Sequence, residues 1–363
     1  MYSNRAKLSS VLTGAAALAM SALLVGTGAT AVAAPRGDSV RGDSVNRANV
    51  AKTVSMAFFA FSTTNNYTDA ELTGMKIEAA KLGGVDIHVI SANGDATTQY
   101  NQLLTAASDK LYQAAIIDPI DNVGVAPAAE KLIKAGTITG AVSNTIGPSS
   151  TSLQPQVPGI FFSGTAPNHD TQIMAQQVVS YCANLNPCTV VILIAGLQFP
   201  FDKVRYDTFL SVLNPHKNIK VVALGQDTYS TSTALTNMQD ILQAHPHFDV
   251  LLSDADQETE GAQIALKDAG WNLPQLIGAK KLYIISLGGD QAAMTAVRDG
   301  DWSADVGNFP VSAGEYALLE IVNKVRGLPY QQVVDIDYHA PVPLLLAKAV
   351  LAKYPSFKGQ WSD

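Results

Sequence analysis

From residue 52 onward, short apolar or β-branched runs alternate with longer segments in which apolar residues recur at helical spacing. This alternation is typical of βα units arranged around parallel sheets. The predicted strands are 53–61, 86–90, 114–117, 137–142, 189–195, 220–224 and 249–253. The predicted helices are 72–82, 97–107, 125–135, 171–183, 202–213, 231–244 and 257–269.

A segment rich in Ser, Pro and Gly at 147–159 interrupts the alternation and divides it into two similar series. We therefore expect two α/β lobes, each built around a parallel sheet. In open parallel sheets, a ligand crevice forms beyond the carboxyl ends of the strands. The loops that follow the predicted strands are rich in Asn, Asp, Ser, Thr and aromatic residues, which can bind hydroxyl groups and stack on apolar rings.

The N-terminal segment has the order of a secretory leader. Arg5 and Lys7 precede an uncharged apolar stretch at 11–32, which ends with small residues at a cleavage site after Ala33. We expect residues 1–33 to be a signal peptide; the alternative is an uncleaved membrane anchor. No Cys follows the leader, so a lipid anchor is not indicated. The protein is expected to be periplasmic or secreted.

Residues 34–51 are polar and contain Arg-Gly-Asp-Ser-Val twice, at 36–40 and 41–45. An Arg-Gly-Asp triplet can act as a cell-adhesion signal, but such triplets also occur by chance. We expect a disordered tether here.

Charge argues against one class of partner. The chain has a formal net charge of -7 and 15% charged residues. Removal of the leader takes away two positive charges, Arg5 and Lys7, which changes the net charge from -7 to -9. Nucleic-acid binding depends on clustered Lys and Arg, so it is disfavoured.

The two cysteines, Cys182 and Cys188, lie close together where a predicted helix meets a predicted strand. In an oxidising compartment this spacing predicts a local disulfide. A metal site would need further ligands, and a catalytic thiol would need a nearby base.

Motifs for catalysis are missing: the sequence has no nucleophile elbow, phosphate-binding loop, dinucleotide fingerprint or His-Glu-x-x-His zinc motif. His245 and His247 could place two metal ligands together, but a solvated turn is the simpler interpretation. The acids at 254–260 could suggest glycoside hydrolysis, although a helix N-terminus also favours negative charge. Of these acids, Asp254 and Asp256 are expected to face a crevice. The sequence predicts binding without catalysis, and neither a cofactor nor a metal.

Five short segments resemble the periplasmic sugar-binding proteins of ABC importers, of the ribose-binding type. They are Ser62-Thr63-Thr64-Asn65-Asn66-Tyr67, Glu78-Ala79-Ala80-Lys81-Leu82-Gly83, Ile117-Asp118-Pro119, Ala244-His245-Pro246 and Ala296-Val297-Arg298-Asp299-Gly300. The resemblance covers 53–342 and implies two Rossmann-like lobes joined by a three-strand hinge, the type I periplasmic binding fold. Applied to this chain, it places 52–160 plus 310–337 in an N-terminal lobe and 161–309 plus 338–363 in a C-terminal lobe. LacI-like repressors share these lobes but carry a helix-turn-helix where this chain has its leader.

The resemblance also implies ligand-binding residues. Asn65 and Asn308 would bond ligand hydroxyls, Tyr67 and Tyr229 would supply aromatic faces, and Arg205 would grip hydroxyls from the second lobe. The alternatives without ligand binding are a surface ion pair for Arg205 and core packing for the tyrosines. Asn144 and Asp256 complete the expected set.

This chain departs from the family at three pocket positions. Ser143-Asn144 replaces an Asp-Arg pair, Ala255 replaces an Asn, and Gly288 replaces an Asp. A shift of one residue would restore an acid from Asp254, Asp256 or Asp290. If the charges are lost, the ligand should differ from a pyranose in hydroxyl number or shape.

The implied function is that of an exported monomer that binds a small sugar, polyol or related uncharged metabolite and delivers it to a membrane permease. Two alternatives remain open at this point. One is a ligand-sensing subunit for a chemoreceptor or kinase, and the other is a secreted hydrolase that uses the region of Asp254 and Asp256.

Overall fold

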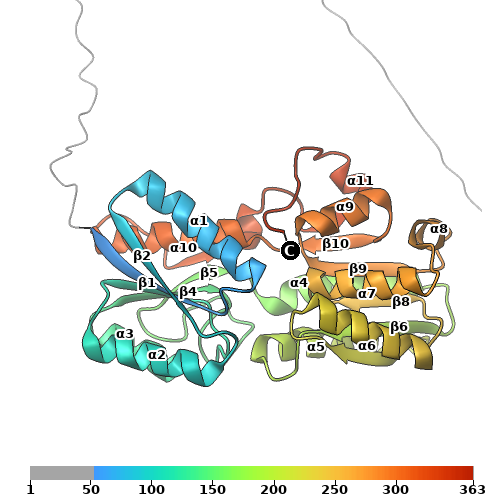
Figure 1. Ribbon diagram of the computed structural model, residues 1–363, viewed down its shortest axis with the longest axis horizontal. Coiled ribbons are helices and arrows are strands. Elements are labelled where there is room, and N and C mark those ends of the chain that lie inside the picture. Colours follow the sequence, from blue (N-terminus) through green and yellow to red (C-terminus); the bar gives the residue numbers. More distant parts are fainter. Residues whose placement is uncertain (1–52, 363) are drawn as a thin grey trace, which may run out of the picture. The chain divides into compact units, whose positions relative to one another are not determined.

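The computed structural model describes residues 53–362. The expected signal peptide at 1–33 and tether at 34–51, with its Arg-Gly-Asp repeats, lie outside the described residues. The described chain forms two α/β lobes, each built on a six-stranded sheet (Figure 1). This is the expected fold class.

The first sheet has the strand order β11-β5-β4-β3-β1-β2, and all of its pairs are parallel. Its strands are β1 (Val54–Ala60), β2 (Val85–Ser91), β3 (Ala114–Ile117), β4 (Ile138–Ser143), β5 (Phe161–Gly164) and β11 (Val333–Asp335). The strand β1, which lies between β3 and β2, is buried on both faces, as its continuous apolar sequence predicts. Met56 and Phe58 pack in one core with Met75, whereas Phe59 packs in another with Leu103.

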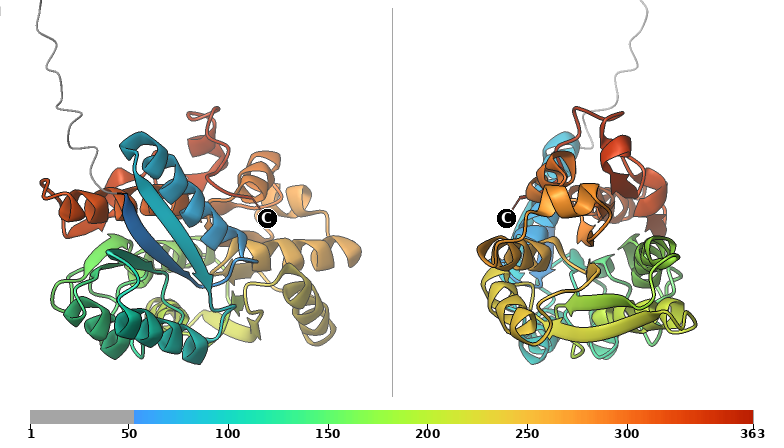
Figure 2. Two further views of the ribbon diagram at one scale, coloured as in Figure 1. Left: turned by 60° about the vertical axis from the view of Figure 1, so that its left-hand side comes forward. Right: turned by 90° about the vertical axis from the view of Figure 1, so that its right-hand side faces the viewer.

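Helices cover both faces of this sheet (Figure 2). The pair α1 and α10 packs together on one face, and the pair α2 and α3 packs together on the other. These helices are α1 (Asn66–Leu82), α10 (Pro310–Val325), α2 (Ala96–Asp109) and α3 (Ala126–Lys134). The close approach of α1 and α10 depends on glycine, because a Cβ atom at Gly74 would lie 2.0 Å from the carbonyl oxygen of Val311.

The second sheet repeats the same order as β12-β10-β9-β8-β6-β7. Its strands are β6 (Cys188–Ile194), β7 (Ile219–Gln226), β8 (Val250–Ser253), β9 (Tyr283–Gly288), β10 (Ala304–Gly307) and β12 (Leu345–Ala347). The edge strand β12 runs antiparallel to β10, so this sheet is not purely parallel. Its helices are α4 (Pro167–Cys182), α5 (Pro200–Leu213), α6 (Thr231–Ala244), α7 (Asp256–Asp268), α8 (Leu273–Gly278), α9 (Gln291–Asp299) and α11 (Lys348–Leu351).

Three segments, which we call the hinge segments, connect the lobes. Residues 165–166 lead from β5 to α4, residues 308–309 lead from β10 to α10, and residues 336–344 lead from β11 to β12. The third contains the 3₁₀ helix η2 (Ile336–His339). These connections correspond to the expected hinge.

The structure differs from the sequence-based division at one boundary. Residues 161–164, expected at the start of the C-terminal lobe, form β5 and pair with β4 of the first sheet. This four-residue strand directly follows the Ser-, Pro- and Gly-rich segment, and the sequence pattern does not separate it from that segment. The strands β11 and β12, of three residues each, were not predicted either.

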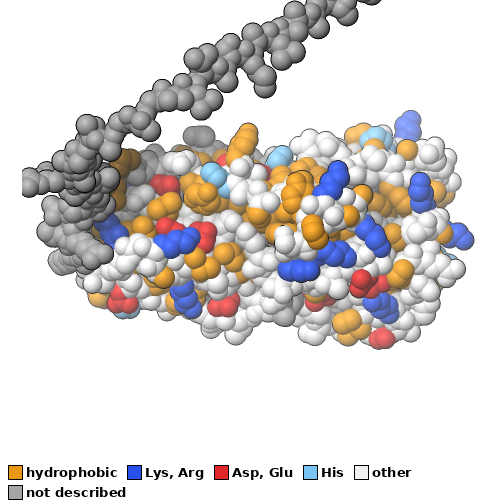
Figure 3. All heavy atoms as spheres, turned by 90° about the horizontal axis from the view of Figure 1, so that it is seen from above, with side chains coloured by type: hydrophobic (Ala, Val, Ile, Leu, Met, Phe, Trp, Pro, Cys, Tyr) orange, Lys and Arg blue, Asp and Glu red, His pale blue; other side chains and the backbone are white. Residues whose placement is uncertain are grey.

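The expected disulfide is confirmed, and it links Cys182 at the end of α4 to Cys188 at the start of β6. Within 53–362, no helix is long and apolar enough to cross a membrane. Seen from above, Lys and Arg side chains are scattered among hydrophobic and uncharged ones (Figure 3).

Candidate functional site

The strand order fixes where a cavity can form. In each sheet, the strand that comes first in the sequence lies between the second and the third. In the first sheet β1 lies between β2 and β3, and in the second sheet β6 lies between β7 and β8. Such a reversal separates the loops at the carboxyl ends and leaves a crevice between them. Asp118 directly follows β3, and Asp254 directly follows β8, so the two aspartates occupy equivalent places in the two lobes.

A cavity lies at these strand ends, with an empty volume of about 700 Å³ that includes a part open to solvent. Both lobes and the hinge segments contribute to its wall. Six of the seven residues expected to bind ligand line it, namely Asn65, Tyr67, Asn144, Arg205, Tyr229 and Asn308. The three positions where this chain departs from the family, Ser143, Ala255 and Gly288, line it too.

Asn65 has a structural role as well as a place in the wall. Its side-chain oxygen accepts a hydrogen bond from the backbone N–H of Thr68 at 3.1 Å, which caps the N-terminus of α1. The cap fixes the side chain at the start of the helix and uses its carbonyl oxygen. The amide NH₂ group is therefore the part of Asn65 that can serve a ligand.

Tyr67 connects the first lobe to the hinge. Its hydroxyl group donates to the side-chain oxygen of Asn308 at 2.9 Å and lies 3.3 Å from the hydroxyl of Ser143. Ser143 in turn donates to the carboxylate of Glu71. Burial raises the pKa of Tyr67 and that of Glu71 well above their ordinary values.

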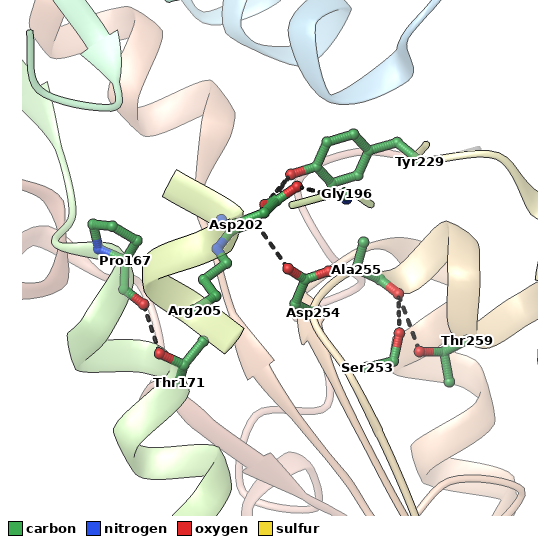
Figure 4. A network of polar contacts seen from close by, with 10 residues as sticks. All are labelled: Pro167, Thr171, Gly196, Asp202, Arg205, Tyr229, Ser253, Asp254, Ala255 and Thr259. Carbon is green, nitrogen blue, oxygen red and sulfur yellow. Dashed lines mark hydrogen bonds and ion pairs between the residues drawn. The ribbon is translucent and has the colours of Figure 1, made fainter. Parts of the chain in front are cut away.

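Arg205 is the centre of the polar network in the second lobe (Figure 4). Its Nη1 donates to Asp202 and to the hydroxyl of Tyr229, each at 3.1 Å, and Tyr229 donates to Asp202 at 2.7 Å. Burial alone would lower the pKa of Arg205, but its acidic neighbours and Tyr229 raise it, so the guanidinium stays charged. Arg205 therefore lines the cavity and also forms an ion pair with Asp202, which is buried and not at the surface.

Asp254 faces the same cavity with unused bonding capacity. Its carboxylate lies 3.8 Å from Arg205 Nη1, and neither oxygen has a hydrogen-bond partner of normal geometry among the described residues. Arg205 Nε also has none within the described chain. A buried donor and a buried acceptor without partners are costly, so the geometry suits a ligand whose hydroxyl groups can serve both.

Asp118 supplies an acid from the first lobe. Its Oδ2 accepts from the backbone N–H of Phe61 at 3.3 Å and from the hydroxyl of Thr68 at 3.1 Å. Burial raises the pKa of Asp118 to about 6. Acidic groups therefore line the cavity from both lobes, even though Ser143, Ala255 and Gly288 carry no charge.

Asp256 does not line the cavity, in contrast to the expectation. Its Oδ1 accepts from Ser286 at 2.7 Å, and its Oδ2 accepts from the backbone N–H of Asp290 at 2.9 Å. The side chain of this first residue of α7 is thus buried under the β9–α9 turn. Gly288 makes room for it, because a Cβ atom there would lie 2.4 Å from Asp256 Oδ2.

Aromatic side chains form much of the remaining wall, and several were not predicted. Trp361 donates from its ring N–H to the carbonyl oxygen of Gly288 at 3.1 Å, and its ring meets that of Tyr67 edge-on at 5.6 Å. Phe61 and Phe201 also line the cavity. No local pattern could have indicated Trp361, since it lies near the C-terminus and reaches the site only because the chain folds back.

The loops at the mouth bring the two lobes into contact. The ring of Phe61 lies 5.7 Å from that of Phe199 and 6.3 Å from that of Tyr229. Phe199 also stacks on Phe201 at the start of α5, with ring centroids 5.7 Å apart, so this side of the site is apolar. His245 and His247 lie elsewhere, in the turn between α6 and β8.

Comparison with known proteins places this geometry in a family. A family model described as periplasmic binding protein domain matches residues 56–329. The D-apiose import binding protein of Actinobacillus succinogenes is 24% identical over 206 residues, which cover 57% of this chain but only 63% of that protein.

Solved structures share the fold. The myo-inositol binding protein of Caulobacter, bound to myo-inositol, is 22% identical with a TM-score of 0.70, covering 84% of this chain and 96% of its own. An ABC transporter solute-binding protein from Mycobacterium smegmatis with bound glycerol is 21% identical, with a TM-score of 0.68. The match covers 83% of this chain and 96% of that protein's chain. The family match spans most of the described residues, and the chain therefore belongs to the periplasmic binding protein family.

Proposed function

We propose that this protein is an exported solute-binding protein of an ABC importer, which holds a small uncharged sugar or polyol between its lobes and delivers it to a membrane permease. The observation that carries the proposal is the cavity, where Arg205 Nε and the Asp254 oxygens lack hydrogen-bond partners and lie among aromatic rings. Relatives named for apiose import and for inositol binding support the same class of ligand.

The chemistry of the wall favours a polyhydroxylated molecule. A hydroxyl group both donates and accepts, so one ligand hydroxyl can accept from Arg205 while another donates to Asp254. Tyr67, Trp361 and Phe201 offer flat apolar surfaces for the C–H faces of a ring or chain. A ligand lacking hydroxyls would leave Arg205 Nε and the Asp254 oxygens without hydrogen bonds, which is the basis of specificity.

Binding is proposed to occur without a reaction. Among the described residues that line the cavity there is no His, Cys or Lys. The three hinge segments allow the lobes to close over a ligand and to open for its release, as in other hinged binding proteins. We propose a monomer that acts outside the cytoplasm, with residues 1–33 as its leader and 34–51 as its tether.

A thermal-shift screen tests this function directly. Pentoses, hexoses, polyols and small organic acids are added to the purified protein, and a true ligand should raise the melting temperature in proportion to the logarithm of its concentration. Chromatography of the same samples should recover the ligand unchanged. Turnover of a glycoside would contradict the proposal, and so would a ligand bound outside the cavity.

Variants locate the site. Asn144→Ala removes an amide from the wall, and Arg205→Lys keeps a charge but loses the planar fork of donors. Both should reduce the shift caused by the ligand. Lys203→Ala, on the same helix as Arg205 but in an exposed pair with Asp207, is the matched control and should leave it intact. Equal shifts in all three variants would contradict the assignment of the site.

A further inference from the structure

A second cluster of ligand-forming side chains lies at the hinge, outside the cavity. His169 and Asp170 are in the first turn of α4, which packs on β8, β9 and β10 of the second lobe. Asp337 is in η2, which packs against α10 and β5 of the first lobe. The cluster thus joins the third hinge segment to α4 of the second lobe.

The three side chains converge closely. His169 Nδ1 lies 2.7 Å from Asp337 Oδ2, and one possible ligand atom from each of the three residues lies within 4.8 Å of the others. A tetrahedral ion with bonds of about 2.1 Å holds its ligands roughly 3.4 Å apart. Small side-chain rotations would bring these atoms to that spacing.

The acids of the cluster have oxygens without partners. Asp170 is 1% exposed, and its Oδ1 has no hydrogen-bond partner among residues 53–362; its other oxygen accepts from Thr165 at 3.3 Å. Asp337 Oδ1 is also buried without a partner within that range. His169 pairs with only one of the two acids, and Asp335 adds a further negative charge nearby. One imidazole therefore faces more acidic groups than it can pair with.

We propose that His169, Asp170 and Asp337 bind a divalent transition-metal ion of the Zn²⁺ type. One imidazole nitrogen and two carboxylates suit Zn²⁺, whereas Ca²⁺ and Mg²⁺ prefer oxygen ligands throughout. The side chain of His169 is 51% exposed, so water can complete the coordination. The ion would satisfy both acids and tie α4 of the second lobe to η2 of the first.

The proposed metal site also adjoins the ligand cavity. Thr165 lines the cavity and donates to Asp170, so one threonine separates the two sites. The metal would fix the position of Asp170, and through it the first hinge segment.

The test uses protein purified without a polyhistidine tag and dialysed free of metal. Titration calorimetry with ZnCl₂ should show one saturable site per chain, and the melting temperature should rise with Zn²⁺ but not with Mg²⁺ or Ca²⁺. His169→Ala and the isosteric Asp337→Asn should each weaken Zn²⁺ binding by at least about tenfold, since loss even of an outer partner of a metal ligand costs that much.

His245→Ala/His247→Ala is the matched control, because this close pair, in which His247 is exposed, is the obvious competing place for Zn²⁺ on the second lobe. It should leave the saturable site unchanged. The proposal is overturned if Zn²⁺ binding is lost in this control and kept in His169→Ala. It is equally overturned if no saturable binding occurs in the parent protein. Neither outcome depends on which solute the cavity holds.

Discussion

The hydroxyl group of Tyr67 donates a hydrogen bond to the side chain of Asn308 across 2.9 Å, although 241 positions separate the two residues. Tyr67 belongs to α1 of the first lobe, and Asn308 belongs to the second hinge segment. Asn308 Oδ1 also accepts from the backbone N–H of Phe309 at 3.0 Å. One amide oxygen thus connects the start of α10 to α1 at the wall of the cavity.

Tyr67→Phe should lower the free energy of unfolding by about 1 kcal/mol, because it removes one buried hydrogen bond and leaves the ring in place. Urea denaturation measures the loss. Tyr338→Phe is the control, since Tyr338 is 87% exposed and its hydroxyl can bond water in either state. Equal stability of both variants would show that the bond to Asn308 contributes nothing.

Gly288→Ala should destabilise the protein by roughly 1–3 kcal/mol, the usual cost of overpacking. The added Cβ would lie 2.4 Å from Asp256 Oδ2 and 3.1 Å from the ring of Trp361, neither of which has free space. Ligand affinity should fall as well, because Trp361 lines the cavity. The control is Gly278→Ala, where nothing lies within 4 Å of the new methyl group and no loss is expected. A Gly288→Ala protein as stable as the parent would refute this packing.

Removal of the disulfide in Cys182→Ala/Cys188→Ala should cost about 2 kcal/mol, since the bridge closes a short loop and restricts the unfolded chain only modestly. Differential scanning calorimetry with and without a reducing agent tests this. The reducing agent should lower the melting temperature of the parent and leave that of the double variant unchanged. A parent protein that keeps its melting temperature after full reduction would contradict the prediction.

Stability should decrease as the pH rises from 5 to 8. Burial raises the pKa of Asp118 to about 6 and that of Asp170 to about 7, whereas an aspartate in an unfolded chain titrates near 3.9. Between these values the folded state holds protons that the unfolded state releases. The stabilisation that these two acids provide is therefore complete below their pKa in the unfolded chain, and it is lost as the pH rises through their pKa in the folded protein.

Urea denaturation in metal-free buffer at pH 5 and pH 8 measures this difference, which should reach a few kcal/mol at about 1.4 kcal/mol per pKa unit. Asp118→Asn should reduce it, because an amide can still accept from Phe61 and Thr68 but does not titrate. Greater stability at pH 8 than at pH 5 would mean that the buried acids are already ionised in the folded protein.

Much of the fold could be read from local patterns. The predicted strand 114–117 and helix 231–244 coincide with β3 and α6, and most other predicted elements agree within a few residues. No bounds were predicted for the elements after residue 269, among them the 16-residue helix α10, or for the strand β5. Three of the strands without a prediction, β5, β11 and β12, have only three or four residues each. Such strands form because a sheet edge is already present for them to pair with.

The residues proposed to bind ligand divide in the same way. The sequence indicated which loops follow strands, and these loops contain Asn65, Tyr67 and Tyr229. The resemblance to sugar-binding proteins pointed to the same three residues and to Arg205, which lies in α5. Only the tertiary structure decided that Asp254 faces the cavity while Asp256 turns under Gly288, because a difference of two residues depends on how α7 meets the neighbouring turn. The contact between Trp361 and Tyr67 and the contact between His169 and Asp337 were also decided only by the tertiary structure. Contacts between distant segments depend on how the lobes pack and not on local sequence.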